Sequence, residues 1–272
     1  MAQMTFWDHL EDLRWSICRV VGVWLALAVV YFLTMPYIFD NVILAPCNSD
    51  FILYEVMRDV AQKFGVDGDV VGDGFTIQIV NIELIAPLFI HISTAFMLSV
   101  VTAVPYLLYE VWKYISPALY EAEQRGVKRA FIFGSLMFFI GVSVGYFLIY
   151  PLTLRFLTSY QLSPSVENML SLSSYIDNFT MLIIAMGIAF ELPILLWLLS
   201  LLGIVTREML KEYRRHAVVV IVIIAAVITP TSDPFTLTLV ALPLYMLYEL
   251  SLLVVKSKKK EEEQEEEQQK EE

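Results

Sequence analysis

Long apolar stretches separated by short polar segments make up most of the chain. The apolar runs cover residues 15–35, 88–109, 130–150, 175–204, 217–228 and 235–255. About 20 apolar residues cross a bilayer as a helix, and only helices or closed barrels satisfy their backbone in lipid. The pattern therefore predicts an all-α integral membrane protein with six transmembrane helices. The fifth run rises only about 18 Å against about 30 Å of hydrocarbon, so it either spans a thinned bilayer or forms a re-entrant hairpin with the sixth.

Lysine and arginine lie almost entirely on one side of this predicted bundle. Of the 18 basic residues, all but Arg58, Lys63 and Arg155 fall at the start of the first run, in the second and fourth connections, or after the sixth run. Cytoplasmic segments are enriched in lysine and arginine, so both termini are predicted to be cytoplasmic. We expect a membrane domain at 1–255, with a large periplasmic loop at 36–87, and a charged cytoplasmic tail at 256–272.

The two external loops, 36–87 and 151–174, are predicted to form structured caps on the membrane domain. Ser49 and Asp50 are candidate N-caps for a helix. Its apolar positions recur at helical spacing, at Leu53, Val56, Met57, Val60 and Phe64. Glycines at 65, 68, 72 and 74 end that helix, and residues 75–80 indicate a weak strand.

Composition supports the membrane class. Hydrophobic residues make up 58% of the chain, against about 45–50% in soluble domains. Much of the net charge of -11 comes from residues 261–272, which are nearly all acidic or glutamine. Such a run cannot bury a core, so we expect a solvated tail, with a docking segment as the less favoured alternative. Cys18 and Cys47 are predicted at opposite faces of the membrane, too far apart for a disulfide.

An acidic patch precedes the first apolar run. Asp8, Glu11 and Asp12 share one face of a predicted amphipathic helix. This patch could receive a basic partner at the membrane surface. Alternatively, the acids complement the dipole of the helix N-terminus, and Arg14 pairs with Glu11. Periodicity alone favours the second explanation.

The cytoplasmic segment 110–129 mixes aromatic and charged residues, as interfacial belts do. It also places Leu119 and Glu123 one helical turn apart. An arginine followed by apolar residues in a partner peptide would suit this pair, because guanidinium binds carboxylate in a bidentate fork that lysine cannot reproduce.

Glu191 lies in the middle of the fourth run and is followed by Pro193. An acid at this depth faces protein or water, or is protonated, and intramembrane acids are functional candidates by default. The structural alternative is a hydrogen bond between helices of this chain. Pro193 frees the carbonyl of Ala189, so the helix should bend near the acid.

No enzyme signature is found. The sequence contains no phosphate-binding loop, nucleophile elbow or zinc-binding pair, and its three histidines have no ligand spacing. We therefore expect no catalytic residue, no metal and no cofactor.

Several short motifs together resemble one family of membrane proteins. They are His9-Leu10-Glu11-Asp12-Leu13-Arg14, Tyr109-Glu110-Val111-Trp112, Pro117-Ala118-Leu119-Tyr120, Glu123, Arg125, Phe190-Glu191-Leu192-Pro193, Thr229-Pro230, Asp233, Pro243 and Glu249. In combination, from about residue 9 to residue 249, the chain resembles the TatC family, the receptor subunit of the twin-arginine protein translocase. The resemblance implies a compact bundle in the bacterial inner membrane whose fifth and sixth helices are short.

The resemblance also implies a function and its residues. Such a protein receives the twin-arginine signal peptide of folded cargo and nucleates export driven by the proton motive force. The implied signal-peptide site comprises Glu11, Asp12, Arg14, Tyr114, Leu119, Glu123 and Arg125. Glu191 and Thr229 would meet TatA- and TatB-like single-span subunits, self-association is expected, and Pro46 matches a loop proline linked to transport.

Two other classes remain open from the residues alone. An ion-coupled small-solute transporter could use Glu191, although the chain shows no internal repeat and no second ionisable group near mid-membrane. A membrane scaffold without a transport role is the weaker alternative.

Overall fold

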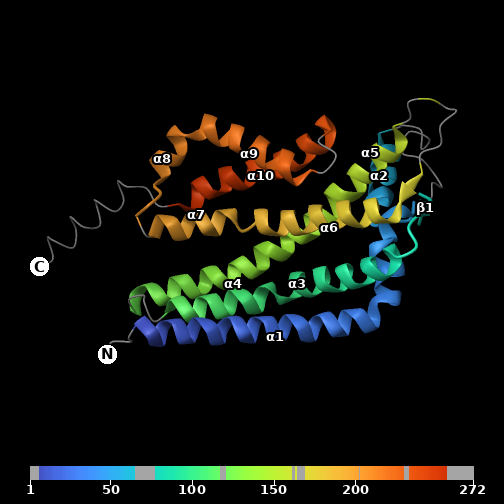
Figure 1. The fold of residues 1–272 in the computed structure, drawn as a ribbon. Helices are drawn as coiled ribbons and strands as arrows, with labels where there is room; N and C mark the ends of the chain where they lie inside the picture. The colour runs from blue at the N-terminus through green and yellow to red at the C-terminus, as the bar shows by residue number, and fades with distance from the viewer. Residues whose placement is uncertain are drawn as a thin grey trace, which may run out of the picture.

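The computed structural model of the protein describes residues 6–64, 77–116, 121–160, 163, 169–201, 203–229 and 233–255, and only the backbone of 6–9 and 121–126. Long helices run side by side along one axis, and shorter elements gather at the ends (Figure 1). The α-helices are α1 (Phe6–Ile38), α2 (Ile52–Lys63), α3 (Ala86–Ile115), α4 (Glu121–Val144), α5 (Tyr150–Ser159), α6 (Leu172–Ala189), α7 (Leu192–Leu201), α8 (Arg207–Glu212), α9 (Arg214–Ile228) and α10 (Pro234–Val254). Two π-helical turns, η1 (Phe39–Ile43) and η5 (Gly145–Ile149), a 3-10 turn, η2 (Ala45–Cys47), and strands β1 (Ile79–Val80) and β2 (Leu170–Ser171) complete the described part.

Five segments of the described chain are long and apolar enough to cross a membrane. They are Leu10–Cys47, Ala86–Ile115, Val127–Ser159, Leu172–Leu201 and Pro234–Val254. The multi-spanning helical class is therefore confirmed. Helix α9 has 15 residues and rises about 22 Å, so a sixth span stays a prediction.

The sixth apolar run forms α10, which is the shortest of these five segments. Helix α10 has 21 residues and continues through Pro243. Asp233 caps its start, because the carboxylate accepts a hydrogen bond from the amide of Thr236 at 2.8 Å. The helix is therefore as long as a regular membrane-spanning helix.

The two ends of the bundle differ. In Figure 1 the start of α1, the end of α3, the start of α4 and the end of α10 lie at one end, which we call the open end. Helices α2 and α5 and strand β1 lie at the opposite, capped end. Both described chain ends are thus at the open end, as the charge pattern predicted for a shared side.

Helix α1 packs chiefly against α3, and side-chain hydrogen bonds to backbone carbonyls help to hold the two together. Trp24 Nε1 donates to the carbonyl of Phe96 at 3.4 Å. A ring nitrogen of His91 donates to the carbonyl of Phe32 at 2.9 Å, and the two rings stack. Pro36 has no amide to offer that carbonyl, so His91 satisfies the acceptor that the proline frees.

Two predicted helix ends were placed too early, both at prolines. Helix α1 continues past Pro36 to Ile38. The third long helix passes through a π-helical turn and continues as α5, which has Pro151 near its start. A proline is tolerated at the first turn of a helical segment, where the missing amide has no partner to lose.

The first long loop contains the predicted amphipathic helix, α2. Its N-cap is Phe51, which offers no side-chain cap, so the expected capping by Ser49 or Asp50 was wrong. Of the predicted strand 75–80, residues 75–76 lie outside the described chain, and β1 pairs in parallel with β2 from the second loop. The expected loop glycines 65, 68, 72 and 74 also lie outside it.

Buried tyrosines hold the elements of the capped end together by donating hydrogen bonds to backbone carbonyls. The Tyr54 hydroxyl lies 3.2 Å from the carbonyl of Pro46 and 3.0 Å from that of Pro151. Tyr175 donates to the carbonyl of Ile43, and Tyr150 to that of Tyr175. Burial raises the pKa of Tyr54 well above its usual value, so the phenol stays a donor.

Helices α4 and α6 cross closely because glycines lie at the contact. A Cβ added at Gly141 would lie 2.5 Å from the carbonyl oxygen of Met186 and 2.8 Å from Cβ of Phe190. A Cβ added at Gly187 would lie 2.7 Å from the ring of Phe138. Small residues let helix backbones approach in membranes, where packing replaces the hydrophobic effect as the main attraction.

Replacing Gly141 with alanine should destabilise the bundle, because the new methyl group meets backbone rather than a movable side chain. We expect a cost of about 1–3 kcal/mol, as for other overpacked sites, measured as a lower unfolding temperature in detergent. Gly22→Ala is the matched control, since nothing lies within 4 Å of its added Cβ. Equal unfolding temperatures for the two variants would contradict the close crossing.

Candidate functional site

The predicted acidic patch lies at the start of α1, at the open end. Arg14 Nη2 lies 3.1 Å from Glu11 Oε1, and both side chains are largely exposed. This contact confirms the local pair that periodicity favoured. Asp12 is exposed, and within the described part of the chain its carboxylate shows no hydrogen bond or ion pair. It is therefore free to accept a ligand.

The other predicted signal-peptide residues belong to the end of α3 and the start of α4. Tyr114 lies in the last turn of α3. Leu119 lies outside the described chain, whereas Glu123 and Arg125 lie in α4, with only their backbone described. The start of α1 and the start of α4 meet at the same end of the bundle (Figure 1). Asp12 and Glu123 are thus on one side of the membrane domain.

An ion pair that sequence reasoning did not identify joins the exposed Arg19 of α1 to the buried Glu110 of α3 near this end. Arg19 Nε lies 3.0 Å from Glu110 Oε1, and its Nη2 lies 2.7 Å from Oε2. The Tyr106 hydroxyl donates to the same carboxylate at 3.0 Å, and Arg19 also donates to Ser16 at 2.9 Å. Only 4% of the Glu110 side chain is exposed. The bidentate fork and its two extra hydrogen bonds satisfy a charge that lipid could not.

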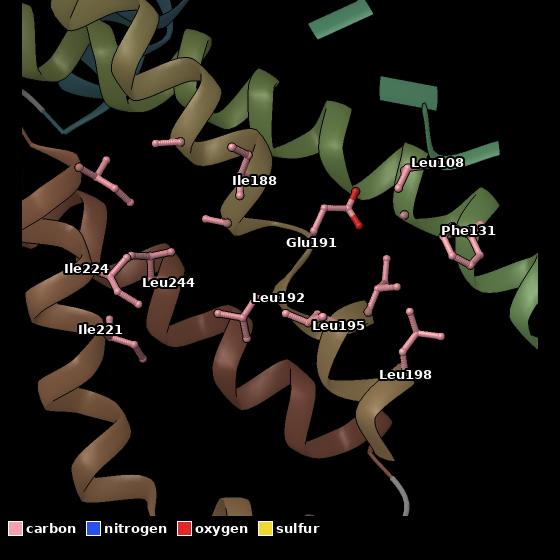
Figure 2. A pocket seen from close by; sticks show the side chains of 15 residues that line it. Leu108, Phe131, Ile188, Glu191, Leu192, Leu195, Leu198, Ile221, Ile224 and Leu244 are labelled. Carbon is pink, nitrogen blue, oxygen red and sulfur yellow. The ribbon is translucent and has the colours of Figure 1, made fainter. Parts of the chain in front are cut away.

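Glu191 lies in the break between α6 and α7, which confirms the predicted interruption. The Glu191 amide donates to the carbonyl of Ile188 at 3.0 Å, and the carbonyl of Glu191 accepts from the amides of Ile194 and Leu195. Pro193 cannot donate to the carbonyl of Ala189, so the regular ladder stops here. The side chain extends from the break toward α4 (Figure 2).

The Glu191 carboxylate borders an apolar cavity of about 610 Å³. Residues from α3, α4, α6, α7, α9 and α10 line it, and Glu191 is the one ionisable residue among them. Oε1 is buried and has no hydrogen-bond partner in the described part of the chain. A Cβ on Gly134 would lie 3.0 Å from Oε2, so the glycine makes room for the acid against α4. The cavity therefore offers a single unsatisfied polar group in an apolar wall.

The remaining predicted site residues lie elsewhere. Thr229 is buried at the end of α9 and donates to the carbonyl of Ala225 at 2.9 Å. Its neighbour Ile228, rather than Thr229, lines the cavity. Pro46 is buried in η2 at the capped end. Among the residues described, no cluster of histidine, cysteine and acidic side chains could hold a metal ion.

Five long apolar helical segments define the class, a multi-pass helical membrane protein. The family model for the Sec-independent protein translocase protein (TatC) matches residues 8–243. The chain belongs to this family, whose members are components of a protein translocase.

Relatives and solved structures agree with this assignment. The chain is 30% identical to the Sec-independent protein translocase protein TatC of Blattabacterium sp. subsp. Periplaneta americana, covering 93% of this chain and 95% of the relative. Identity to the TatC of Deinococcus radiodurans is 33%, covering 93% and 86%. A crystal structure of a twin arginine translocase receptor, TatC, in DDM superposes with a TM-score of 0.72 at 29% identity, covering 91% of this chain and 99% of that one.

Replacing Arg19 with alanine should destabilise the chain more than replacing both Arg19 with alanine and Glu110 with glutamine. The single change leaves a buried carboxylate without its cation, whereas the double change removes the charge as well. Thermal unfolding in detergent measures the difference, which we expect to be several degrees. Arg14→Ala breaks an exposed pair and should have no measurable effect. Equal losses for the single and double variants would show that Glu110 does not need Arg19.

Proposed function

We propose that the chain is the receptor component of a twin-arginine translocation system. It binds the twin-arginine signal peptide of folded proteins at the open end and nucleates their export, driven by the proton motive force. The observation that carries the proposal is that α1 and α4 both start at the same end of the bundle. Support also comes from the solved structures to which this chain is similar, which are titled twin arginine translocase receptor.

Two carboxylates would hold the arginine pair. Asp12 is exposed and unengaged within the described residues, and Glu123 lies in the first turn of α4. Guanidinium groups bind carboxylates bidentately, so two acids at one end suit two adjacent arginines better than two lysines. Glu11 is already engaged with Arg14, which makes Asp12 the better acceptor on α1. Tyr114, Leu119 and Arg125 would flank the bound peptide.

This proposal sets an orientation. The open end faces the cytoplasm, with both termini, and the capped end faces the periplasm, across the bacterial inner membrane. The excess of lysine and arginine at the open end supports this orientation. Under it, α9 forms a sixth, short span beside α10.

The cavity at Glu191 is the proposed contact for TatA- and TatB-like single-span subunits. A polar side chain on an incoming helix would satisfy the orphan carboxyl oxygen, and the apolar lining would take the rest of that helix. A solute pathway is less well supported, because the described residues that line the cavity include no second ionisable group.

Replacing Glu123 with alanine should weaken binding of a twin-arginine peptide while membrane insertion is preserved. Loss of charge-assisted hydrogen bonds worth about 1.5–3 kcal/mol corresponds to roughly 10- to 100-fold in affinity. Titration of a labelled peptide against the purified chain in nanodiscs measures this affinity. Asp12→Ala should behave similarly.

Glu121→Ala is the matched control, since Glu121 lies in the same first turn of α4. A double-lysine peptide should bind weakly to every variant. Unchanged twin-arginine affinity for both Asp12→Ala and Glu123→Ala would overturn the receptor proposal.

Replacing Glu191 with leucine should stabilise the isolated chain and abolish capture of the single-span subunits. The change removes an unsatisfied buried polar group, which costs about 1–3 kcal/mol, but it also removes the proposed contact. Co-purification with TatA- and TatB-like subunits, and thermal unfolding without them, measure the two effects. Glu191→Gln keeps a hydrogen-bonding group and should retain part of the capture. Full capture by Glu191→Leu would place the contact elsewhere.

A further inference from the structure

Helix α2 carries an apolar stripe that no other part of the described chain covers. Its members recur every fourth residue, so they form one edge of the helix. Their exposed fractions are 59% for Ile52, 55% for Val56, 48% for Val60 and 81% for Phe64. Helix α2 lies outside the five membrane-spanning segments, so lipid contact along a span does not account for the stripe.

The neighbouring faces of α2 have other roles. Tyr54 points into the cap, where it is 1% exposed and hydrogen-bonded to two carbonyls. Glu55, Asp59 and Gln62 are exposed on the polar face. One side of the helix is thus buried in the cap, and its polar face is exposed to water, which suits polar side chains. Its apolar edge is exposed as well, although apolar side chains favour an apolar environment.

The start of α2 touches the lipid-facing surface of the bundle. The ring of Phe51, the N-cap residue, stacks on Phe147, with centroids 6.0 Å apart. Phe147 is 44% exposed and belongs to the membrane-spanning segment Val127–Ser159. Next to it, Leu148 is 41% exposed. The apolar stripe of α2 therefore begins beside an apolar surface that already faces hydrocarbon.

The orientation and depth of α2 fit a membrane surface. In Figure 1, α2 lies at the capped end, crosswise to the long helices. A helix in this position runs along the plane of the bilayer. Tyr37 and Tyr160, which are 73% and 67% exposed, also lie near the ends of their helices at this end, and exposed tyrosines mark the headgroup level.

We propose that α2 is an interfacial membrane anchor whose stripe of Ile52, Val56, Val60 and Phe64 dips into the lipid of the adjacent leaflet. Amphipathic helices of this kind lie with their apolar face at the boundary of headgroups and acyl chains. Lys63, exposed at the end of the helix, is placed to meet lipid phosphates. Such an anchor would fix the cap to the membrane surface. This role is separate from the proposed binding of signal peptides.

Lipid suits the stripe better than a protein partner does. Three of its four residues are aliphatic, whereas binding hot spots in protein interfaces are enriched in tryptophan, tyrosine and arginine. The stripe is also continuous with the exposed surface at Phe147, so a bilayer covers both without a second docking event.

Spin-label accessibility tests the anchor on the full chain reconstituted in phosphatidylcholine and phosphatidylglycerol vesicles. Cys18, which is exposed, is replaced by alanine, and the buried Cys47 is retained. Nitroxides are then placed at Val56→Cys and Val60→Cys on the stripe, and at Glu55→Cys and Asp59→Cys on the polar face. Collision with oxygen reports lipid, and collision with a soluble nickel chelate reports water.

We expect the ratio of oxygen to nickel accessibility to be several-fold higher on the stripe than on the polar face. Equal ratios on both faces would overturn the anchor, because the stripe would then face water. Low accessibility to both reagents on the stripe would also overturn it, in favour of a protein contact. Dilution with unlabelled chain would then identify a second copy by loss of spin–spin broadening. No signal peptide is used, so this test is independent of the receptor proposal.

Discussion

A polar group that lies unpaired in lipid costs free energy. This constraint determines how helix α1 is held in the bundle. Only 6% of the residues in the most apolar stretch of the first segment are buried inside the protein. Packing alone therefore does not fix the position of α1 along the axis of α3. Three contacts each join one position of α1 to one position of α3. They are the ion pair of Arg19 with Glu110 and the hydrogen bonds from Trp24 to Phe96 and from His91 to Phe32. Since Asp12 lies on α1 and Glu123 follows α3, the same contacts determine where the two proposed acceptors lie relative to each other.

Two acids in the helices differ in how far they meet this constraint. Glu110 is surrounded by donors, whereas one carboxyl oxygen of Glu191 has none in the described part of the chain. The acid lies at a break in the helix, beside Gly134 and at the border of an apolar cavity. Glu110 therefore has a structural role, whereas the unpaired oxygen of Glu191 supports the proposed contact with a partner helix.

Local features of this fold could be predicted from the sequence, whereas distant pairings could not. The spans, helix α2 and the break at Glu191 follow from periodicity and from Pro193, which act within a few residues. The Arg19–Glu110 pair joins residues 91 apart, and no local pattern identifies the partner. Pro36 was expected to end its helix, but the carbonyl it frees is satisfied by His91, 59 residues away. A charge within an apolar run signals that a partner exists, not which residue it is.

The two ends of the bundle are built for different tasks. At the capped end, tyrosines from three elements donate to backbone carbonyls, and β1 pairs with β2, so the connecting segments are tied to the helices and to each other. If α2 also rests on the lipid surface, that end is held both by the protein and by the membrane. At the open end, Asp12 has no such partner in the described residues, and the polar contacts lie further along the helices. The proposed receptor function needs this asymmetry, because its binding groups must be unengaged while the helices that carry them stay in register.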